Sequence, residues 1–266
     1  MTDWIAFLHE IADATDRIAT RHFRAASLEV ETKGDASPVT VADRGIEDAA
    51  HVLVRARHPE MGLLGEETGE TGAGRDTRLI IDPIDGTRNF VRGVPIFATL
   101  LAVEQAGNVV AGLVSAPALG QRWHAARGAG AWNGTRRLAV STLSQLARAH
   151  LFHGSLGGTG EGNPLPGLLT LAGQVERTRG FGDFYQHVLV AEGAGEIAVD
   201  PVVNPWDIAA LQVLVEEAGG RATSLAGDRT IHGGSLISTN GRLHAAVLAA
   251  LAGRVAIAEC RVQSAD

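Results

Sequence analysis

The stretch that decides the fold of this chain is DPIDGTRNF, residues 82–90, which follows directly on the apolar run Leu79–Ile81. The apolar run predicts a short strand, and two aspartates stand three residues apart at its end, with Pro83 restricting the turn between them. This spacing directs the carboxylates of Asp82 and Asp85 toward a common centre. Carboxylate oxygens of this kind suit Mg²⁺, which prefers near-octahedral oxygen ligands and commonly bridges to a substrate phosphate.

The two residues after Asp85 predict a phosphate cradle. The backbone N–H groups of Gly86 and Thr87 can approach a phosphate without hindrance from a Cβ atom at Gly86, and the Thr87 hydroxyl can hold a water or a substrate oxygen. The plain alternative is a turn with two solvated aspartates, which is the commoner meaning of a bare Asp-x-x-Asp-Gly string. The wider sequence has to decide between these interpretations.

Two further acidic sites favour the metal interpretation. Glu66-Glu67 follows Gly65 at the end of a short apolar stretch, and Asp207 follows Trp206 at the start of an apolar helical segment. By itself the first pair fits a surface turn, and Asp207 fits a first-turn acid that interacts with the helix dipole. Carboxylates that share one site repel one another strongly, so three such sites coexist at short range only with cations between them.

Composition and charge narrow the functional classes. The chain has 266 residues, enough for one large domain or two closely packed halves, and a formal net charge of −7 that opposes a nucleic-acid backbone. We therefore expect no nucleic-acid partner, whereas divalent metals would invert the local potential and admit a phosphate ester. No apolar run approaches the ~18 residues of a membrane span. The N-terminus shows no secretory pattern and the single cysteine, Cys260, has no internal partner, so a cytoplasmic location is expected.

The hydrophobic pattern predicts an α+β fold, because segments of helical and of strand periodicity alternate along the chain. Residues 68–78 are rich in glycine and polar side chains and are predicted to form a mobile loop, and Gly219-Gly220 is expected to end a helix. Helices are predicted at 4–24, 42–57 (opened by Thr40 or Asp43), 165–175, 183–192, 205–218 and 244–251, and strands at 78–82, 97–104, 109–115, 122–126, 131–133, 150–153, 177–178 and 196–199.

Taken together, these motifs resemble the signature of the inositol monophosphatase family. The matching strings occur in the family's order across about residues 33–248: VTVAD at 39–43, GEE at 65–67, DPIDGTRNF at 82–90, WDIAA at 206–210 and EAGG at 217–220. The resemblance implies a layered αβαβα sugar-phosphatase fold in a single domain, 1–266, with a metal and phosphate half at 1–145 and a substrate half at 146–266. It also implies a homodimer and Mg²⁺-assisted hydrolysis of a phosphate monoester, with lithium as an inhibitor.

The resemblance assigns the metal ligands residue by residue. Glu66, Asp82 and the carbonyl of Ile84 would bind a first Mg²⁺ ion, while Asp82, Asp85 and Asp207 would bind a second, with two or three ions in all. In the two-metal scheme one ion lowers the pKa of the nucleophilic water and the other stabilises the leaving alkoxide, so no covalent enzyme intermediate is required. None of the ten histidines is assigned to a metal, because none shows metal-ligand spacing.

Catalytic roles follow from the same resemblance. Glu66 and Thr87, with Asp43 nearby, would orient and deprotonate the attacking water for in-line attack. The N–H groups of Gly86 and Thr87 would hold the phosphate, next to Asp85.

Residues in the second half of the chain would bind the alcohol part of the substrate. Residues 179–185, RGFGDFY, resemble the stretch that contacts the alcohol, and Asp183 stands where inositol-specific relatives carry small residues. Asp200 falls where such relatives place another acid. Two acids beside the leaving group favour an alcohol that carries an ammonium group, as in L-histidinol phosphate, and the surrounding strings look like the histidinol-phosphatase branch of the family. The expected substrate contacts are Arg179, Asp183 and Asp200 on the alcohol side and Asp85, Gly86, Thr87 and Asp207 on the phosphate side.

Several alternatives stay open at this point. Asp183 also fits a helix N-cap, and His187 fits either the core or the pocket. The substrate could instead be inositol 1-phosphate or a range of sugar phosphates. A catalytically silent scaffold of the same fold is the third alternative, and the sequence argues against it because no expected ligand position is substituted.

Overall fold

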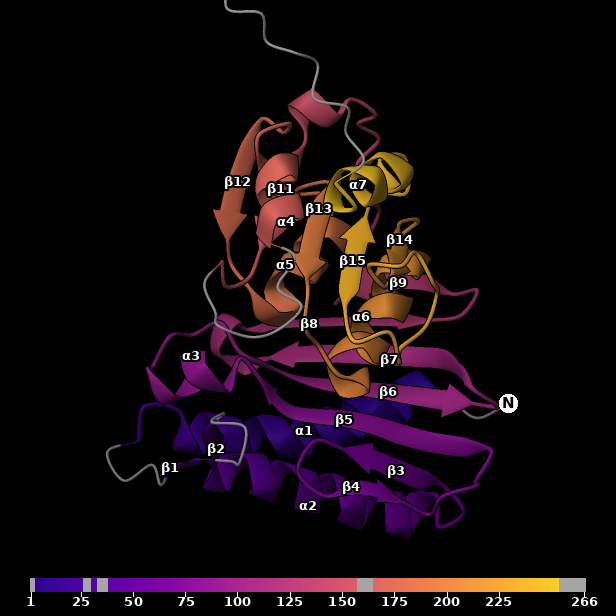
Figure 1. Cartoon of the computed structure of the whole chain (residues 1–266). Coiled ribbons are helices and arrows are strands. Elements are labelled where there is room, and N and C mark those ends of the chain that lie inside the picture. Colours follow the sequence, from indigo (N-terminus) through magenta and orange to yellow (C-terminus); the bar gives the residue numbers. More distant parts are fainter. Residues whose placement is uncertain (1–2, 26–29, 33–37, 157–164, 254–266) are drawn as a thin grey trace, which may run out of the picture.

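Five layers make up the molecule, as Figure 1 shows for the computed structural model, which describes residues 3–25, 30–32, 38–156 and 165–253. Two helices cover the outer face of an eight-stranded sheet, two more helices lie between that sheet and a five-stranded one, and a final helical pair covers the far side. The predicted α+β class and αβαβα layering are therefore confirmed. Residues 33–37, which precede the VTVAD motif, and Cys260 lie outside the described residues.

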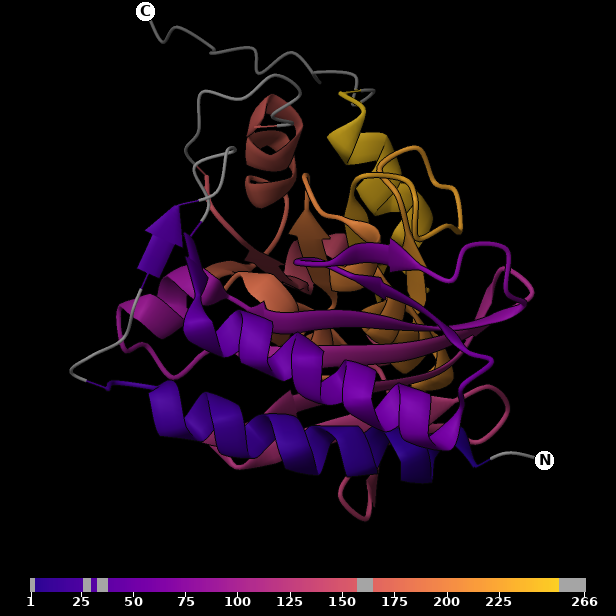
Figure 2. The ribbon, with the colours of Figure 1, turned by 90° about the horizontal axis from the view of Figure 1, so that it is seen from below.

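One outer layer consists of α1 (Trp4–His22) and α2 (Val41–Arg57), which lie beneath the eight-stranded sheet in Figure 1 and side by side in front of it in Figure 2. The N-terminus of α1 is capped by Asp3, whose carboxylate accepts a hydrogen bond from the Ala6 N–H at 3.1 Å. At α2 both predicted openers take part: Thr40 is the N-cap, and Asp43 reaches back to its backbone N–H in a capping box. The start of α2 is thus fixed by local side-chain chemistry.

The eight-stranded sheet has the order β10-β9-β8-β7-β6-β5-β3-β4, and all its pairs are antiparallel except β3 with β5. The prediction of a loop at residues 68–78 is partly wrong, because β4 pairs with β3 there and β5 begins at Thr77. Glycine at 69 has a left-handed backbone (φ 68°), which closes this tight hairpin and explains why a glycine-rich segment still forms a ladder. The strands are β3 (Gly62–Gly65), β4 (Gly69–Thr71), β5 (Thr77–Asp85), β6 (Ala98–Gln105), β7 (Asn108–Ala116), β8 (Gln121–Ala126), β9 (Gly130–Asn133) and β10 (Arg136–Arg137).

Strand β5 runs through Pro83 and does not end in a turn at Asp82 as the sequence predicts. Opposite β6, Asp82 pairs with Leu100 and Asp85 with Ala98, so the register shifts by one residue between the two aspartates. In a regular strand, residues three apart point to opposite faces, and the extra residue of a β-bulge cancels that alternation. The Pro83 carbonyl is satisfied there by the Thr99 hydroxyl at 2.8 Å. The bulge therefore places both carboxylates on the same side.

The five-stranded sheet has the order β12-β11-β13-β15-β14 and lies on the other side of α5 (Asp183–Ala191) and α6 (Pro205–Glu217). Its last two strands have three and four residues and were not predicted, because such short runs carry too little periodicity. The strands are β11 (His150–His153), β12 (Arg177–Gly180), β13 (Ile197–Asp200), β14 (Arg221–Thr223) and β15 (Leu236–Thr239). The helices α4 (Leu165–Ala172) and α7 (His244–Leu251) cover the far face of this sheet.

The remaining short elements lie at the ends of the layers. A two-stranded ribbon, β1 (Val30–Thr32) with β2 (Pro38–Thr40), precedes α2, and α3 (Thr87–Val91) follows β5. Single 3₁₀ turns occur at Pro117–Leu119 and Leu146–Arg148. Among the described residues, no helix combines the length and the apolar character that crossing a membrane requires.

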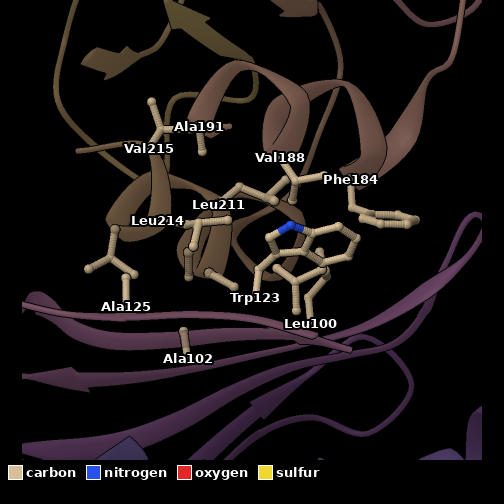
Figure 3. Close-up of a cluster of buried hydrophobic side chains, with 14 of the residues drawn as sticks. Leu100, Ala102, Trp123, Ala125, Phe184, Val188, Ala191, Leu211, Leu214 and Val215 are labelled. Carbon is tan, nitrogen blue, oxygen red and sulfur yellow. The ribbon is translucent and has the colours of Figure 1, made fainter. Parts of the chain in front are cut away.

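The central core fills the space between the eight-stranded sheet and the helices α5 and α6. Trp123 on β8 points up from the sheet against Phe184, Val188 and Leu211, as Figure 3 shows. Residues 208–215 of α6 are all buried, as expected for a helix covered by a sheet on either side. This packing holds the N-termini of α5 and α6 at the end of β5, where the predicted site residues lie.

Candidate active site

A cavity of about 260 Å³ opens where β5, α3, α5, α6 and the turn after β3 meet. Its lining includes Glu66, which comes from the turn after β3. Asp207 comes from the first turn of α6, so the cavity joins residues separated by most of the chain. The lining residues are Glu66, Asp82, Ile84, Asp85, Gly86, Thr87, Asp183, His187, Asp200, Val202, Val203, Asn204, Trp206, Asp207, Leu211 and Leu236.

Three of the predicted metal ligands form a tight acidic cluster. Asp82, Asp85 and Asp207 each offer a carboxylate oxygen, and these oxygens lie within 4.8 Å of one another. Hydrogen bonds orient two of these carboxylates. Asp85 Oδ1 accepts from the Phe184 N–H at 3.0 Å, and Asp207 Oδ2 accepts from the Asn204 N–H at 2.7 Å.

A buried oxygen atom without a hydrogen-bond partner in the described part of the chain shows that the cluster suits a metal ion. Oδ1 of Asp82 is buried and has no hydrogen-bond partner among the described residues. Buried acceptors are nearly always satisfied, so an oxygen left without a donor in an all-carboxylate cluster fits a cation. Glu66 lines the cavity beside this cluster and adds a fourth carboxylate.

The electrostatics of the cluster agree with that conclusion. Burial, followed by the charges of Glu66, Asp207 and Asp85, raises the pKa of Asp82 well above its usual value. Burial and the charges of Asp183 and Asp207 raise the pKa of Asp85 in the same way. Burial also raises the pKa of Asp207 to about 6, against the lowering effect of its hydrogen bonds. These carboxylates resist ionising together, and a bound divalent cation would remove that penalty.

The side of the cavity that is predicted to bind phosphate lies at the junction between β5 and α3. Gly86 has φ 84°, and a Cβ atom there would lie 3.0 Å from the Ile96 carbonyl oxygen and 3.3 Å from Asp183 Oδ2. Only glycine fits this backbone and this space. The Thr87 hydroxyl donates to the Ile84 carbonyl at 2.8 Å, which leaves that carbonyl a second lone pair for a metal ion.

Asp43 and Arg179 lie apart from the cavity lining. Asp43 is buried behind the Glu66 turn, where burial and, more weakly, the charges of Glu67 and Glu66 raise its pKa to about 6. Its Oδ2 accepts from the N–H and hydroxyl of Thr40 at 2.7 and 2.6 Å. Arg179 is exposed on the edge strand β12 and donates to the Thr178 carbonyl, so its predicted contact with the alcohol has no support from this position.

Asp183 and Asp200, the two acids predicted to contact the substrate alcohol, both line the cavity. Asp183 Oδ2 accepts from Asn89 Nδ2 at 3.0 Å, and burial with the charges of Asp200 and Asp207 raises the pKa of Asp183 to about 7. The N-cap of α5 is Gly182, so the alternative of Asp183 as the N-cap is wrong.

His187 resolves the other open alternative, because it is both a core and a cavity residue. It is 1% exposed, yet it lines the cavity. One ring nitrogen lies 2.8 Å from the Ser238 hydroxyl and the other lies 3.0 Å from Asp200 Oδ2. His187 therefore connects the cavity wall to the interior of the five-stranded sheet.

Some residues in and around the cavity were not predicted from the sequence. Asn89 belonged to the quoted motif without a role, and Glu47 carries a signal that could have been used, since it stands one helical turn after Asp43. The apolar wall formed by Val202, Val203 and Leu236 has no sequence signal, because its place in the cavity depends on how the loop after β13 and strand β15 fold back.

Comparison with known proteins agrees with this geometry. The model of the inositol monophosphatase family matches residues 1–256. The chain is 46% identical over 246 residues to a protein of Mycobacterium tuberculosis named histidinol-phosphatase, covering 91% of this chain and 95% of that one. It is 43% identical over 251 residues to a Streptomyces coelicolor protein of the same name, covering 91% and 94%.

Solved structures share the fold over nearly the whole chain. The extragenic suppressor protein suhB of Bartonella henselae superimposes with a TM-score of 0.88 at 30% identity, covering 96% of this chain and 100% of that one. The family match, the relatives and the acidic cavity agree. The chain therefore belongs to the metal-dependent inositol monophosphatase family and is a phosphoric monoester hydrolase.

Proposed function

We propose that this enzyme uses two or three Mg²⁺ ions to hydrolyse L-histidinol phosphate to L-histidinol and phosphate. The metal assignment rests on a donor set made only of oxygens: Asp82, Asp85 and Asp207, with Glu66 and the Ile84 carbonyl beside them. When bound, such ions would activate a water and stabilise the leaving alkoxide.

The chain's own groups would bind and orient the ester. Gly86 and Thr87 line the cavity, and their N–H groups would hold the phosphate while Glu66 and Thr87 would align the attacking water. Asp43 does not line the cavity, so it would act on the water only indirectly, through the charge of the nearby Glu66.

The substrate proposal rests on one observation, the pair of carboxylates on the alcohol side. Asp183 and Asp200 both line the cavity, and among the described residues no Lys or Arg lines it to neutralise them. An alcohol with an ammonium group would supply the missing positive charge through charge-assisted hydrogen bonds. The names of the relatives at 46% and 43% identity point to the same alcohol.

Inositol 1-phosphate or a range of sugar phosphates is the second candidate. The metal and phosphate residues are shared by the whole family and do not distinguish these esters. A homodimer and a cytoplasmic location stay predictions from the sequence.

A phosphate-release assay would test the substrate. With saturating Mg²⁺, the purified enzyme is offered L-histidinol phosphate, inositol 1-phosphate, fructose 1,6-bisphosphate and adenosine 3′,5′-bisphosphate. We expect the highest kcat/KM for L-histidinol phosphate, and an equal or higher value for inositol 1-phosphate would overturn the proposal.

The variant Asp183→Ala tests the carboxylate pair. We expect kcat/KM for L-histidinol phosphate to fall by about tenfold or more, because one charge-assisted contact is lost. Any activity on inositol 1-phosphate should fall less. Asp48→Ala, which removes an exposed carboxylate of α2, is the control and should leave both values unchanged. Full activity of Asp183→Ala on histidinol phosphate would refute the role of the pair.

The catalytic assignment has its own test. Asp85→Asn should abolish turnover of every ester, and retained hydrolysis would show that the acidic cluster is not the catalytic centre.

A further inference from the structure

Glu47 is a buried carboxylate on α2 that no part of the proposed reaction uses. It lies on α2 one turn after Asp43 and is fully buried, with 0% of its surface exposed. A buried carboxylate is costly unless hydrogen-bond donors or a cation compensate it. Its contacts therefore indicate what it stabilises.

Glu47 accepts three hydrogen bonds from the two residues that follow Glu66. The N–H of Glu67 donates to Oε1 at 2.7 Å, and the N–H of Thr68 donates to Oε2 at 3.0 Å. The Thr68 hydroxyl also donates to Oε2, at 2.8 Å. The Glu47 side chain thus connects the turn between β3 and β4 to α2 by three hydrogen bonds.

The residue before Glu66 is held by the same carboxylate through close packing. A Cβ atom at Gly65 would lie 2.6 Å from Oε1 and 2.8 Å from Oε2 of Glu47. The backbone φ of Gly65 is not left-handed, so the close approach, and not the turn geometry, requires glycine here. Glu47 therefore contacts the chain on both sides of Glu66.

We propose that Glu47 is a positioning residue, which holds the turn at residues 65–68 so that the Glu66 carboxylate points into the cavity toward Asp82. The inference rests on the proposed role of Glu66 as a metal ligand. Glu47 itself lies outside the cavity lining and does not touch the substrate.

The chemistry of the three donors requires a carboxylate of this length. An ionised carboxylate accepts hydrogen bonds at both oxygens, whereas the amide of glutamine presents N–H donors at one side, where they would face the donors of Glu67 or Thr68. Aspartate keeps the charge but is one methylene too short to reach the turn from the same helical position. Glu47→Gln therefore tests the charge of the side chain, and Glu47→Asp tests its length.

The test measures Mg²⁺ affinity by isothermal titration calorimetry and, separately, the dependence of kcat/KM on Mg²⁺ concentration. For Glu47→Gln we expect Mg²⁺ binding about tenfold weaker, the effect of one lost hydrogen bond to a charged group. The loss of kcat/KM should be largely recovered at saturating Mg²⁺. Glu47→Asp should behave like Glu47→Gln, because it also releases the turn. Gly65→Ala, which displaces the carboxylate without changing its charge, should weaken Mg²⁺ binding as well.

Glu104→Gln is the matched control. Glu104 on β6 is 5% exposed and pairs with Arg78, so the same substitution removes a buried charged hydrogen bond outside the cavity. Its Mg²⁺ affinity should equal that of the wild type. Far-ultraviolet circular dichroism and the melting temperature would check that each variant folds. If Glu47→Gln does not fold, Thr68→Val, which removes a single donor from the turn, replaces it and should weaken Mg²⁺ binding by a smaller factor.

Two outcomes would overturn the inference. Folded Glu47→Gln with wild-type Mg²⁺ affinity would show that Glu47 only stabilises the fold, and wild-type behaviour of Glu47→Asp would show that charge alone matters. Glu66→Gln separates the inference from its premise. If Glu66→Gln binds Mg²⁺ as the wild type does, the metal role of Glu66 fails; if Glu66→Gln weakens binding and Glu47→Gln does not, only the positioning role fails.

Discussion

Gly86 joins the end of β5 that carries Asp82 and Asp85 to α3, and its backbone and its surroundings both exclude a side chain. Its φ is 84°, a left-handed value that costs a non-glycine residue ~1–2 kcal/mol. A Cβ atom would also lie 3.0 Å from the Ile96 carbonyl oxygen, inside normal contact distance. Strain at this position would be relieved by moving the backbone that presents Asp85 and Thr87.

We therefore expect Gly86→Ala to lower kcat/KM by about a hundredfold, since small displacements of positioning groups have effects of that size. Steady-state phosphate release would measure the loss. Gly107→Ala is the control, because Gly107 has a similar φ of 76° with nothing within 4 Å of an added Cβ. It should share the conformational cost and keep full activity. Equal losses in both variants would refute a specific role for the space around Gly86.

At the scale of the elements, α6 approaches β7 of the eight-stranded sheet very closely. A Cβ atom at Gly112 would lie 2.6 Å from Val213 Cγ1 and 3.0 Å from Cα and O of Ala210. The absent side chain at this position lets the helix that carries Asp207 lie directly on the sheet. The spacing of these two layers sets the position of Asp207 relative to Asp82.

Gly112→Ala should lower the free energy of unfolding by about 1–3 kcal/mol, the usual effect of overpacking a core. Urea denaturation would measure it. Gly45→Ala serves as the comparison, since this glycine lies within α2 with only Ile18 Cγ2 at 3.5 Å, and alanine there should be neutral or stabilising. No loss of stability in Gly112→Ala would mean that α6 can shift away from the sheet at little cost.

His244 supplies a pH-dependent contact at the first residue of α7. It is 1% exposed and lies between two hydroxyls, with Thr223 Oγ1 at 2.9 Å and Thr239 Oγ1 at 3.0 Å from its ring nitrogens. Burial and then the nearby positive charge of Arg221 lower the pKa of His244 from 6.5 to about 4. The folded state thus holds a neutral imidazole that the unfolded chain would protonate below pH 6.5.

The sign of the effect follows from proton linkage. Because the unfolded state binds the proton more readily, His244 contributes stability that is lost as the pH falls from about 6.5 toward about 4. We expect His244→Gln to lose less stability than the wild type between pH 7 and pH 5 in urea titrations. His232→Gln, which changes an exposed histidine, should follow the wild type. Parallel curves for all three proteins would contradict the assignment.

For the whole molecule, the acidic cavity predicts that metal removal lowers stability. Carboxylate oxygens of Asp82, Asp85 and Asp207 lie within 4.8 Å of one another, and their repulsion destabilises the folded state unless a cation binds between them. At a Mg²⁺ concentration about 100 times its dissociation constant, binding adds ~2.7 kcal/mol to the free energy of unfolding.

Scanning calorimetry with Mg²⁺ and with EDTA should show this stabilisation as a rise in Tm of about 5 °C or more. NaCl at equal ionic strength is the control for screening. Asp85→Asn should show a smaller rise than the wild type, because one ligand is lost. An identical Tm in Mg²⁺ and EDTA would mean that the cluster does not hold the ion in the folded protein.

The sequence by itself determined the chemistry and most of the local structure. The acids at 66, 82, 85 and 207 and the glycine at 86 appear in short motifs whose residue types indicate metal and phosphate binding. Helices such as α1, α2 and α6 and the β6–β7 hairpin follow from periodicity and turn residues, which act over a few residues only. The five-layered fold followed from the family resemblance that those motifs carry.

Only the tertiary structure decided which of these residues share a cavity. The bulge at Pro83 depends on pairing with β6 and reverses the face on which Asp85 points, while Arg179, despite its place in the motif, lies on an exposed edge strand. Glu47 acquires its role because α2 packs against a turn that is 20 residues away in sequence. Side-chain direction depends on register, bulges and the stacking of layers, and these are set by contacts between distant segments.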